Sequence, residues 1–312
     1  MGLDMLKTFS MIRQTVIVTI ISFTLTAAEV VQAQTESNPI LKIGIVQRFG
    51  EKPQDRLTLN ATSGQKLTLT FPSADGKSMQ TLTSDRVVVE TASKALTLPK
   101  LEEKVVLSNH RSFENAAASA FHWAEKGVVT EISQPRRWQV WAKRDVYDSI
   151  LLRYLLFYTL RLQGNLTVQI DRRIIPQKTI ASFIVGDFRY NRDHLDVSSS
   201  NGLIEVSYQK ENKSEISNRP YAGTLRLQPN AHQNFTLVNN VPLETYVRGV
   251  VPHEIGYNAP YAAVQAQAIL ARTYVLASLH RFKVDDYELC ADTQCQVYRG
   301  LEDTTELSLI HI

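Results

Sequence analysis

The stretch VVPHEIGYNAPYAAVQAQAILARTYVLAS, from Val250 to Ser278, decides how this sequence is interpreted. It places one carboxylate, Glu254, just ahead of an alanine-rich segment in which Arg272 is the only charge. Apolar residues recur through that segment at the spacing of one helical face. Since small side chains allow close packing on several sides, we predict a buried alanine-rich helix directly after Glu254.

A carboxylate at the entrance of such a helix can be held rigidly. Pro252 predicts that the preceding helix ends before Glu254, because proline disfavours continuation of a helix. Partial burial would raise the pKa of Glu254, as a general acid working near neutral pH needs. The alternative is an acid that only caps a helix or faces solvent.

The composition excludes some functions. The chain has 312 residues, of which 44% are hydrophobic and 21% charged, which is typical of a globular protein of about two domains. Its formal charge is +3, without an arginine-rich run, a Walker motif or a GxGxxG motif. We therefore expect no nucleic-acid partner.

The first 33 residues have the pattern of a secretory signal peptide. Basic residues precede an apolar run, Val16 to Ala28, and small residues, Val31 and Ala33, occupy the −3 and −1 positions of a cleavage site. The run is shorter than the roughly 20 residues that span a membrane. We predict an exported protein of the periplasm or cell envelope, with no stable membrane span after cleavage.

Residues 38–95 contain short alternating runs, such as RLTLNA and KLTLTF, separated by glycine and proline. This pattern predicts a small β module.

Residues 103–164 predict a β-α-β-β segment followed by a helix. Ser112 is a candidate N-cap for the helical run FENAAASAFHWAEKG, and two strand patterns follow it. The segment loosely resembles a SPOR-like peptidoglycan-binding repeat. Trp138 and Trp141 have opposite parity on a strand, so one is expected in the core, and the other is a candidate for stacking on a sugar ring. Residues 145–164 predict a buried amphipathic helix.

Four segments together resemble the SpoIID/LytB domain family: PYAGTLRLQPN, FTLVNNVPLETYVRGVVPHEI, AVQAQAILARTYVLAS and CQVYRG. The likeness runs from about Tyr221 to Gly300, and we assign residues 165–312 to this domain. It implies an α+β fold made of β-rich modules and a SpoIID-type catalytic domain that contains the buried alanine-rich helix. Characterised enzymes of the family are lytic transglycosylases that cleave peptidoglycan glycan strands.

The resemblance also implies roles for residues. The catalytic acid of the family falls on Glu254, and four residues match family motifs as candidates for substrate binding: Arg272, Tyr274, Gln296 and Tyr298. The sequence departs from the family where Glu-Met-Pro becomes Glu254-Ile255-Gly256. It also ends early, on a tract, SLIHI, that is typical of a translated sequencing adapter. We therefore expect an incomplete catalytic domain, inactive in this form.

Ordinary glycoside hydrolysis uses two carboxylates at a defined separation. Here the nearby candidates for a second carboxylate are Glu244 and Asp292. A lytic transglycosylase needs only one, because the substrate supplies the nucleophile.

Cys290 and Cys295, with four residues between them, are compatible with a short disulfide or with two thiolate ligands. Some members of the family hold zinc with two cysteines and a histidine, and His280 or His253 would be the histidine here. In an exported protein a disulfide is favoured. We expect no required cofactor, with a structural zinc as the alternative.

The sequence thus predicts a lytic transglycosylase with Glu254 as general acid and base. The alternative is a non-catalytic glycan-binding protein that recruits or stimulates other cell-wall hydrolases.

Overall fold

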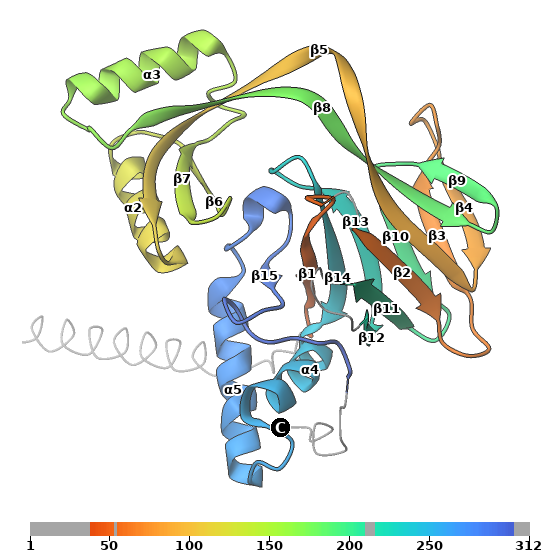
Figure 1. The fold of residues 1–312 in the computed structure, drawn as a ribbon. Coiled ribbons are helices and arrows are strands. Elements are labelled where there is room, and N and C mark those ends of the chain that lie inside the picture. The colour runs from red at the N-terminus through yellow and green to blue at the C-terminus, as the bar shows by residue number, and fades with distance from the viewer. Residues whose placement is uncertain (1–37, 53–54, 210–215, 303–312) are drawn as a thin grey trace, which may run out of the picture. The chain divides into compact units, whose positions relative to one another are not determined.

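The computed structural model describes residues 38–52, 55–209 and 216–302. The predicted signal peptide and the C-terminal SLIHI lie outside the described residues. Residues 39–312 belong to one compact unit, whose described part is a strand-rich α+β fold (Figure 1). The predicted fold class is confirmed at this level.

The first sheet joins strands from distant parts of the chain in the order β15-β1-β14-β13-β10-β3-β4. All neighbours are antiparallel except β1 and β15, which are parallel. Its strands are β1 (Ile40–Phe49), β3 (Leu67–Pro72), β4 (Met79–Ser84), β10 (Leu195–Ser199), β13 (Thr224–Pro229), β14 (Phe235–Pro242) and β15 (Leu289–Cys290).

The second sheet has the order β12-β11-β2-β5-β7-β6, and β8 pairs with both β5 and β9. Strands β5 and β8 form a long antiparallel ribbon from Val88↔Ile184 to Val106↔Gln169, with a shift in register after Ala95. The strands are β2 (Arg56–Ala61), β5 (Arg86–His110), β6 (Thr130–Ser133), β7 (Trp138–Ala142), β8 (Gln169–Val185), β9 (Phe188–Asn191), β11 (Leu203–Gln209) and β12 (Ile216–Ala222).

One core cluster combines inward-facing residues of both sheets with residues of α4 (Leu243–Ile255) and α5 (Tyr261–Ser278). The strand pattern explains it, since every second residue of a strand faces the same side: Leu57 and Leu59 on β2, and Leu67, Leu69 and Phe71 on β3, are buried. Strands predicted for residues 38–95 are present. Strands β1, β2 and β3 pair with β14, β11 and β10, from the later part of the chain, whereas β4 pairs with β3.

A second core cluster lies under α2 (Phe113–Glu125) and α3 (Ile150–Leu162). Ser112 caps α2 as predicted, accepting a hydrogen bond from the Asn115 backbone N–H. The element order β5-α2-β6-β7-α3 has the predicted β-α-β-β segment followed by a helix, and β8 then returns beside β5, so that the strands lie side by side as β8-β5-β7-β6. The SPOR likeness and the domain boundaries stay predictions.

The two tryptophans of β7 correct the sequence interpretation. Trp138 is 4% and Trp141 0% exposed. Trp138 packs against Phe113 and Phe282, and the Trp141 ring lies 4.1 Å from the Lys104 ammonium. Each face of the strand is covered, so neither ring offers a surface for a sugar.

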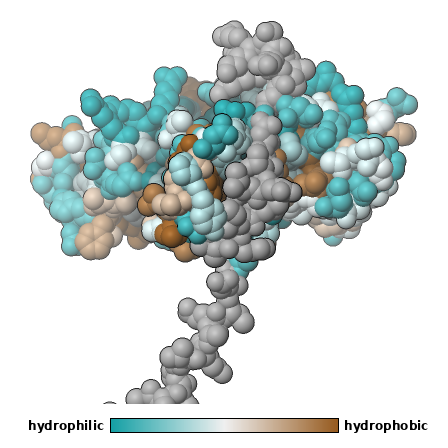
Figure 2. All heavy atoms as spheres, turned by 90° about the horizontal axis from the view of Figure 1, so that it is seen from below, coloured by the Kyte–Doolittle hydropathy of each residue, from teal (hydrophilic) through white to brown (hydrophobic). Residues whose placement is uncertain are grey.

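Helices α3 and α5 are less buried than predicted. In α3, Leu160 is buried, whereas Leu151 and Leu162 are 76% and 89% exposed. In α5 the inner face (Ala268, Ala271, Val275) is buried, but Leu270 is 61% exposed. Figure 2 shows hydrophobic side chains at the surface among hydrophilic ones. Apolar periodicity correctly identified the buried faces of both helices, but it also predicted burial for outer residues that are exposed to solvent.

His232 connects the second core region to the turn between β13 and β14. Its Nε2 lies 3.4 Å from the Ser133 Oγ of β6 and 3.5 Å from the Asp285 Oδ2 of the 3₁₀ turn η1 (Lys283–Asp285). Burial lowers the pKa of His232, and the hydrogen bond and charge of Asp285 oppose this effect. Arg48 and Lys104 lower the pKa further.

This arrangement predicts acid sensitivity. The pKa of His232 is lower in the folded chain than its ordinary value of 6.5, so on acidification the unfolded chain takes up the proton first. The His232 contribution to stability is therefore intact above about pH 6.5 and is lost as the pH falls toward the folded pKa. In urea titrations, His232→Asn should weaken this pH dependence. Equal pH dependence in the wild type and His232→Asn would contradict the assignment.

Candidate active site around Glu254

Glu254 lies in the last turn of α4, and the prediction that the helix ends before it is wrong. Pro252 lacks an N–H, so one helical hydrogen bond, to the Arg248 carbonyl, is missing. The helix tolerates this loss near its end and continues through Ile255. It ends at Gly256, whose φ of 84° suits glycine and whose N–H donates to the Pro252 carbonyl at 3.0 Å.

The Glu254 side chain is exposed, so the predicted partial burial is also wrong. Its Oε1 accepts a hydrogen bond from the Val297 backbone N–H at 2.7 Å. A charge-assisted bond of this length fixes the position of a carboxylate that would otherwise sample several rotamers. The acid is therefore accessible from solvent and anchored at one oxygen.

The segment that supplies the Val297 N–H packs tightly on α4. The Tyr246 hydroxyl donates to the Gln296 Oε1 at 3.2 Å, and the Tyr298 hydroxyl donates to the Asn239 Oδ1 at 2.9 Å. Burial raises the pKa of Tyr246, with smaller contributions from Tyr274 and Glu254, so its hydroxyl keeps the proton that it donates.

Two glycines permit this approach. A Cβ on Gly249 of α4 would lie 2.2 Å from the Gly300 carbonyl oxygen and 2.7 Å from the Tyr298 ring. Gly300 has a φ of 68°, and a Cβ there would lie 2.1 Å from the Pro220 carbonyl oxygen. Both glycines occur in the sequence motifs, but nothing in the motifs shows that they face each other.

The four residues predicted to bind substrate take different positions. Gln296 and Tyr298 are buried, at 6% and 1% exposure, with the packing contacts given above. Arg272 of α5 forms a bidentate ion pair with Glu244 of α4, with Nε 2.7 Å from Oε1. Tyr274 is half-buried, with its ring centroid 5.3 Å from the Arg281 guanidinium. Their part in substrate binding stays a prediction.

The structure joins Cys290 and Cys295 in a disulfide, with 5.6 Å between the Cα atoms. Cys290 ends β15, which pairs with β1 at Gly44. Within the closed turn the Asp292 Oδ1 accepts from the Gln294 backbone N–H at 2.9 Å. A zinc site needs free thiolates, which the disulfide consumes. Within the described ranges, no group of three or more His, Cys, Asp or Glu could hold a metal ion.

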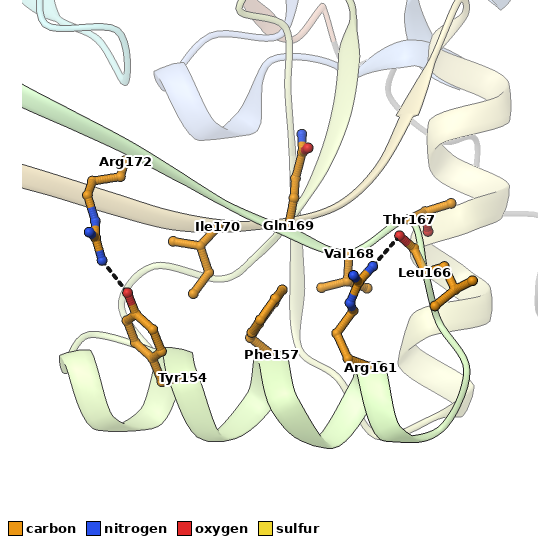
Figure 3. A pocket seen from close by; sticks show the side chains of 9 residues that line it. All are labelled: Tyr154, Phe157, Arg161, Leu166, Thr167, Val168, Gln169, Ile170 and Arg172. Atoms are coloured by element: carbon orange, nitrogen blue, oxygen red, sulfur yellow. Dashed lines mark hydrogen bonds between the residues drawn. The ribbon is translucent and has the colours of Figure 1, made fainter.

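Two pockets lie outside this site, since neither is lined by Glu254. The larger, of about 590 Å³, lies between α3 and β8 (Figure 3). The smaller, of about 290 Å³, is lined by the β5–β8 ribbon and by the turn between β13 and β14.

Residues 231–310 match the SpoIID family model. The model describes the Stage II sporulation protein, and the matched segment contains Glu254, the disulfide and all four predicted substrate-binding residues. A SpoIID domain indicates a function related to the cell wall or to sporulation.

A curated relative, an uncharacterized protein of Brachyspira hyodysenteriae, is 31% identical over 103 residues. The match covers 31% of this chain and 26% of the relative, so this chain spans about a quarter of that protein. No solved structure matches the chain. No helix among the described residues is long and apolar enough to cross a membrane.

The close contact at Gly249 gives a stability prediction. Alanine normally stabilises a helix relative to glycine by about 0.5–1 kcal/mol. Here the added Cβ collides with the Gly300 carbonyl, so Gly249→Ala should lower the free energy of unfolding by roughly 1–3 kcal/mol. Ala262→Met, which enlarges an exposed residue of α5, is the control. Chemical denaturation measures both, and a Gly249→Ala variant as stable as the wild type would refute the tight packing.

The disulfide gives a chemical prediction. Because the chain has two cysteines, the protein denatured without reductant should show no free thiol and should contain no stoichiometric metal. One equivalent of zinc, with two thiols titratable after chelation, would instead establish the zinc alternative.

Proposed function

We propose that this protein cleaves the glycan strands of peptidoglycan as a lytic transglycosylase, with Glu254 as general acid and then general base. The SpoIID match supports the cell-wall substrate. The observation that carries the role of Glu254 is that its carboxylate is exposed while a backbone N–H fixes one oxygen. A group that exchanges protons with a bulky substrate needs both properties.

The reaction needs one carboxyl group used twice. Protonated Glu254 donates its proton to the glycosidic oxygen as the bond from that oxygen to muramyl C1 breaks. The muramyl O6 then bonds to C1, and its hydroxyl proton passes to Glu254. The products are a free sugar hydroxyl and a 1,6-anhydro-muramyl end, so no water is consumed and the acid is regenerated.

The exposure of Glu254 suits a polymeric substrate, because a glycan strand must reach the acid from outside. The sequence predicted that the protein itself desolvates Glu254 by partial burial. We propose instead that the bound glycan strand displaces water from the carboxylate and so desolvates it.

The two other carboxylates have partners of their own. Glu244 is held by Arg272. Asp292 accepts hydrogen bonds from the Gln294 backbone and, at 3.3 Å, from the Gln47 side chain. A hydrolase would need a second carboxylate opposite Glu254, whereas the single-acid mechanism that we propose needs neither Glu244 nor Asp292.

A second candidate is a glycan-binding protein without catalytic activity that recruits other cell-wall hydrolases. The same SpoIID match supports it, because that match indicates a cell-wall function without specifying catalysis. In either case we propose an exported protein of the periplasm or cell envelope, in keeping with the envelope association of SpoIID proteins.

Replacement of the acid separates these functions. Glu254→Gln should reduce cleavage of denuded glycan strands by about 10²–10⁴-fold, the usual contribution of general acid assistance. Folding and glycan binding should persist. Glu125→Gln, at an exposed carboxylate that ends α2, is the matched control.

Product chemistry completes the test. Mass spectrometry of the wild-type products should show 1,6-anhydro-muramyl ends. Reducing muramyl ends would indicate a hydrolase with a second carboxylate. Full activity in Glu254→Gln would exclude Glu254 as the acid, and glycan binding without cleavage by the wild type would establish the binding function.

A further inference from the structure

Helix α3 carries an exposed apolar stripe. Leu151, Leu155, Tyr158 and Leu162 recur at the spacing of one helical face, and they are 76%, 61%, 58% and 89% exposed. Leu166, just beyond the helix, is 73% exposed. Large side chains gathered in this way on one helix mark an interaction surface, whereas single exposed ones do not.

Arginines border the stripe on the side that faces β8. Tyr154, Phe157 and Arg161 lie along the neighbouring line of the helix and line the pocket of about 590 Å³ (Figure 3). The Arg161 Nη1 donates to the Leu166 carbonyl at 2.6 Å, and its guanidinium lies 5.8 Å from the Phe157 ring. Arg172 of β8, at the other end of the pocket, donates to the Glu103 Oε1 at 2.8 Å and to the Tyr154 hydroxyl.

The charge near the stripe is basic toward its C-terminal end, where Lys126 also donates to the Asn165 Oδ1 at 3.1 Å, whereas the exposed Asp148 precedes its N-terminal end. From Ser149 to Ile170 the chain contains Arg153 and Arg161 and no acidic residue. Arg153 pairs with the buried Glu103, which leaves Arg161 at the rim of the stripe. An apolar helical face bordered by arginine complements a surface with an apolar interior and anionic head groups.

We propose that α3 docks this protein on an anionic lipid membrane, with the leucine stripe in the boundary between head groups and acyl chains. Arg161 then meets lipid phosphate. A protein partner is less well matched, because leucine is under-represented among the residues that dominate protein interfaces. The proposal is independent of the proposed glycan cleavage.

Vesicle sedimentation tests the proposal without a glycan substrate. The protein should sediment with vesicles of phosphatidylcholine and phosphatidylglycerol, and less with phosphatidylcholine alone. The double variant Leu155→Gln/Leu162→Gln should bind at least about tenfold more weakly, because two leucines no longer enter the apolar layer. Arg161→Gln should weaken binding to anionic vesicles by about fivefold and reduce its salt dependence.

The exposed face of α5 offers a matched control. Leu270→Gln/Leu276→Gln replaces two leucines that are 61% and 54% exposed on another helix, and it should leave vesicle binding unchanged. Circular dichroism and thermal unfolding check that every variant folds.

Three results would overturn the proposal. One is the absence of wild-type sedimentation with anionic vesicles. Another is equal binding by the wild type and the α3 double variant. The third is a concentration-dependent dimer that the α3 substitutions abolish, because a second copy of the chain would then cover the stripe.

Discussion

The pairing of β1 with β14 on one side and β15 on the other positions both halves of the candidate site. Strand β14 leads directly into α4, and β15 leads directly into the disulfide-closed turn. The start of α4 is also tied to the residue that precedes β1, because the Leu243 N–H donates to the Pro39 carbonyl at 2.9 Å. Because β1 holds both β14 and β15, it fixes where α4 and the segment after Cys290 begin. Glu254 of α4 can therefore contact Val297. Gly44 allows this arrangement, since a Cβ there would lie 2.8 Å from the Tyr287 ring.

Local pattern identified most strands and the capped helix α2, but it could not identify their partners. The run LKIGIVQ reads as a strand from its own residues, whereas its partners lie near residues 238 and 289. Pairing over such distances depends on the whole fold, and no short window of sequence contains it. Local pattern therefore predicted a contiguous β module, because the pairings of β3 with β4 and of β2 with the start of β5 are local, whereas those of β1, β2 and β3 with later strands are not.

The errors on burial have a related cause. Apolar spacing in α3 and α5 indicates that one face of each helix is buried. It does not indicate whether other parts of the chain also pack against the remaining faces. In α5 the small residues Ala268 and Ala271 pack inward as predicted, yet Ile269 and Leu270, which lie between them in the sequence and on the outer side of the helix, are exposed. At the site, family likeness located Glu254, whereas its anchor is a backbone N–H, for which the residue type at position 297 gives no signal.

A main-chain anchor changes which residues the acid depends on. Any residue except proline at position 297 keeps the N–H, so the bond to Glu254 is insensitive to most side chains there. It depends instead on the path of the backbone from Cys290 to Gly300. That path is set by the disulfide at one end, by Gly300 at the other, and by the buried Tyr298 hydroxyl bonded to Asn239 between them. The position of the carboxylate is thus determined by packing groups that never touch it, and a substitution among them displaces the acid without altering its chemistry.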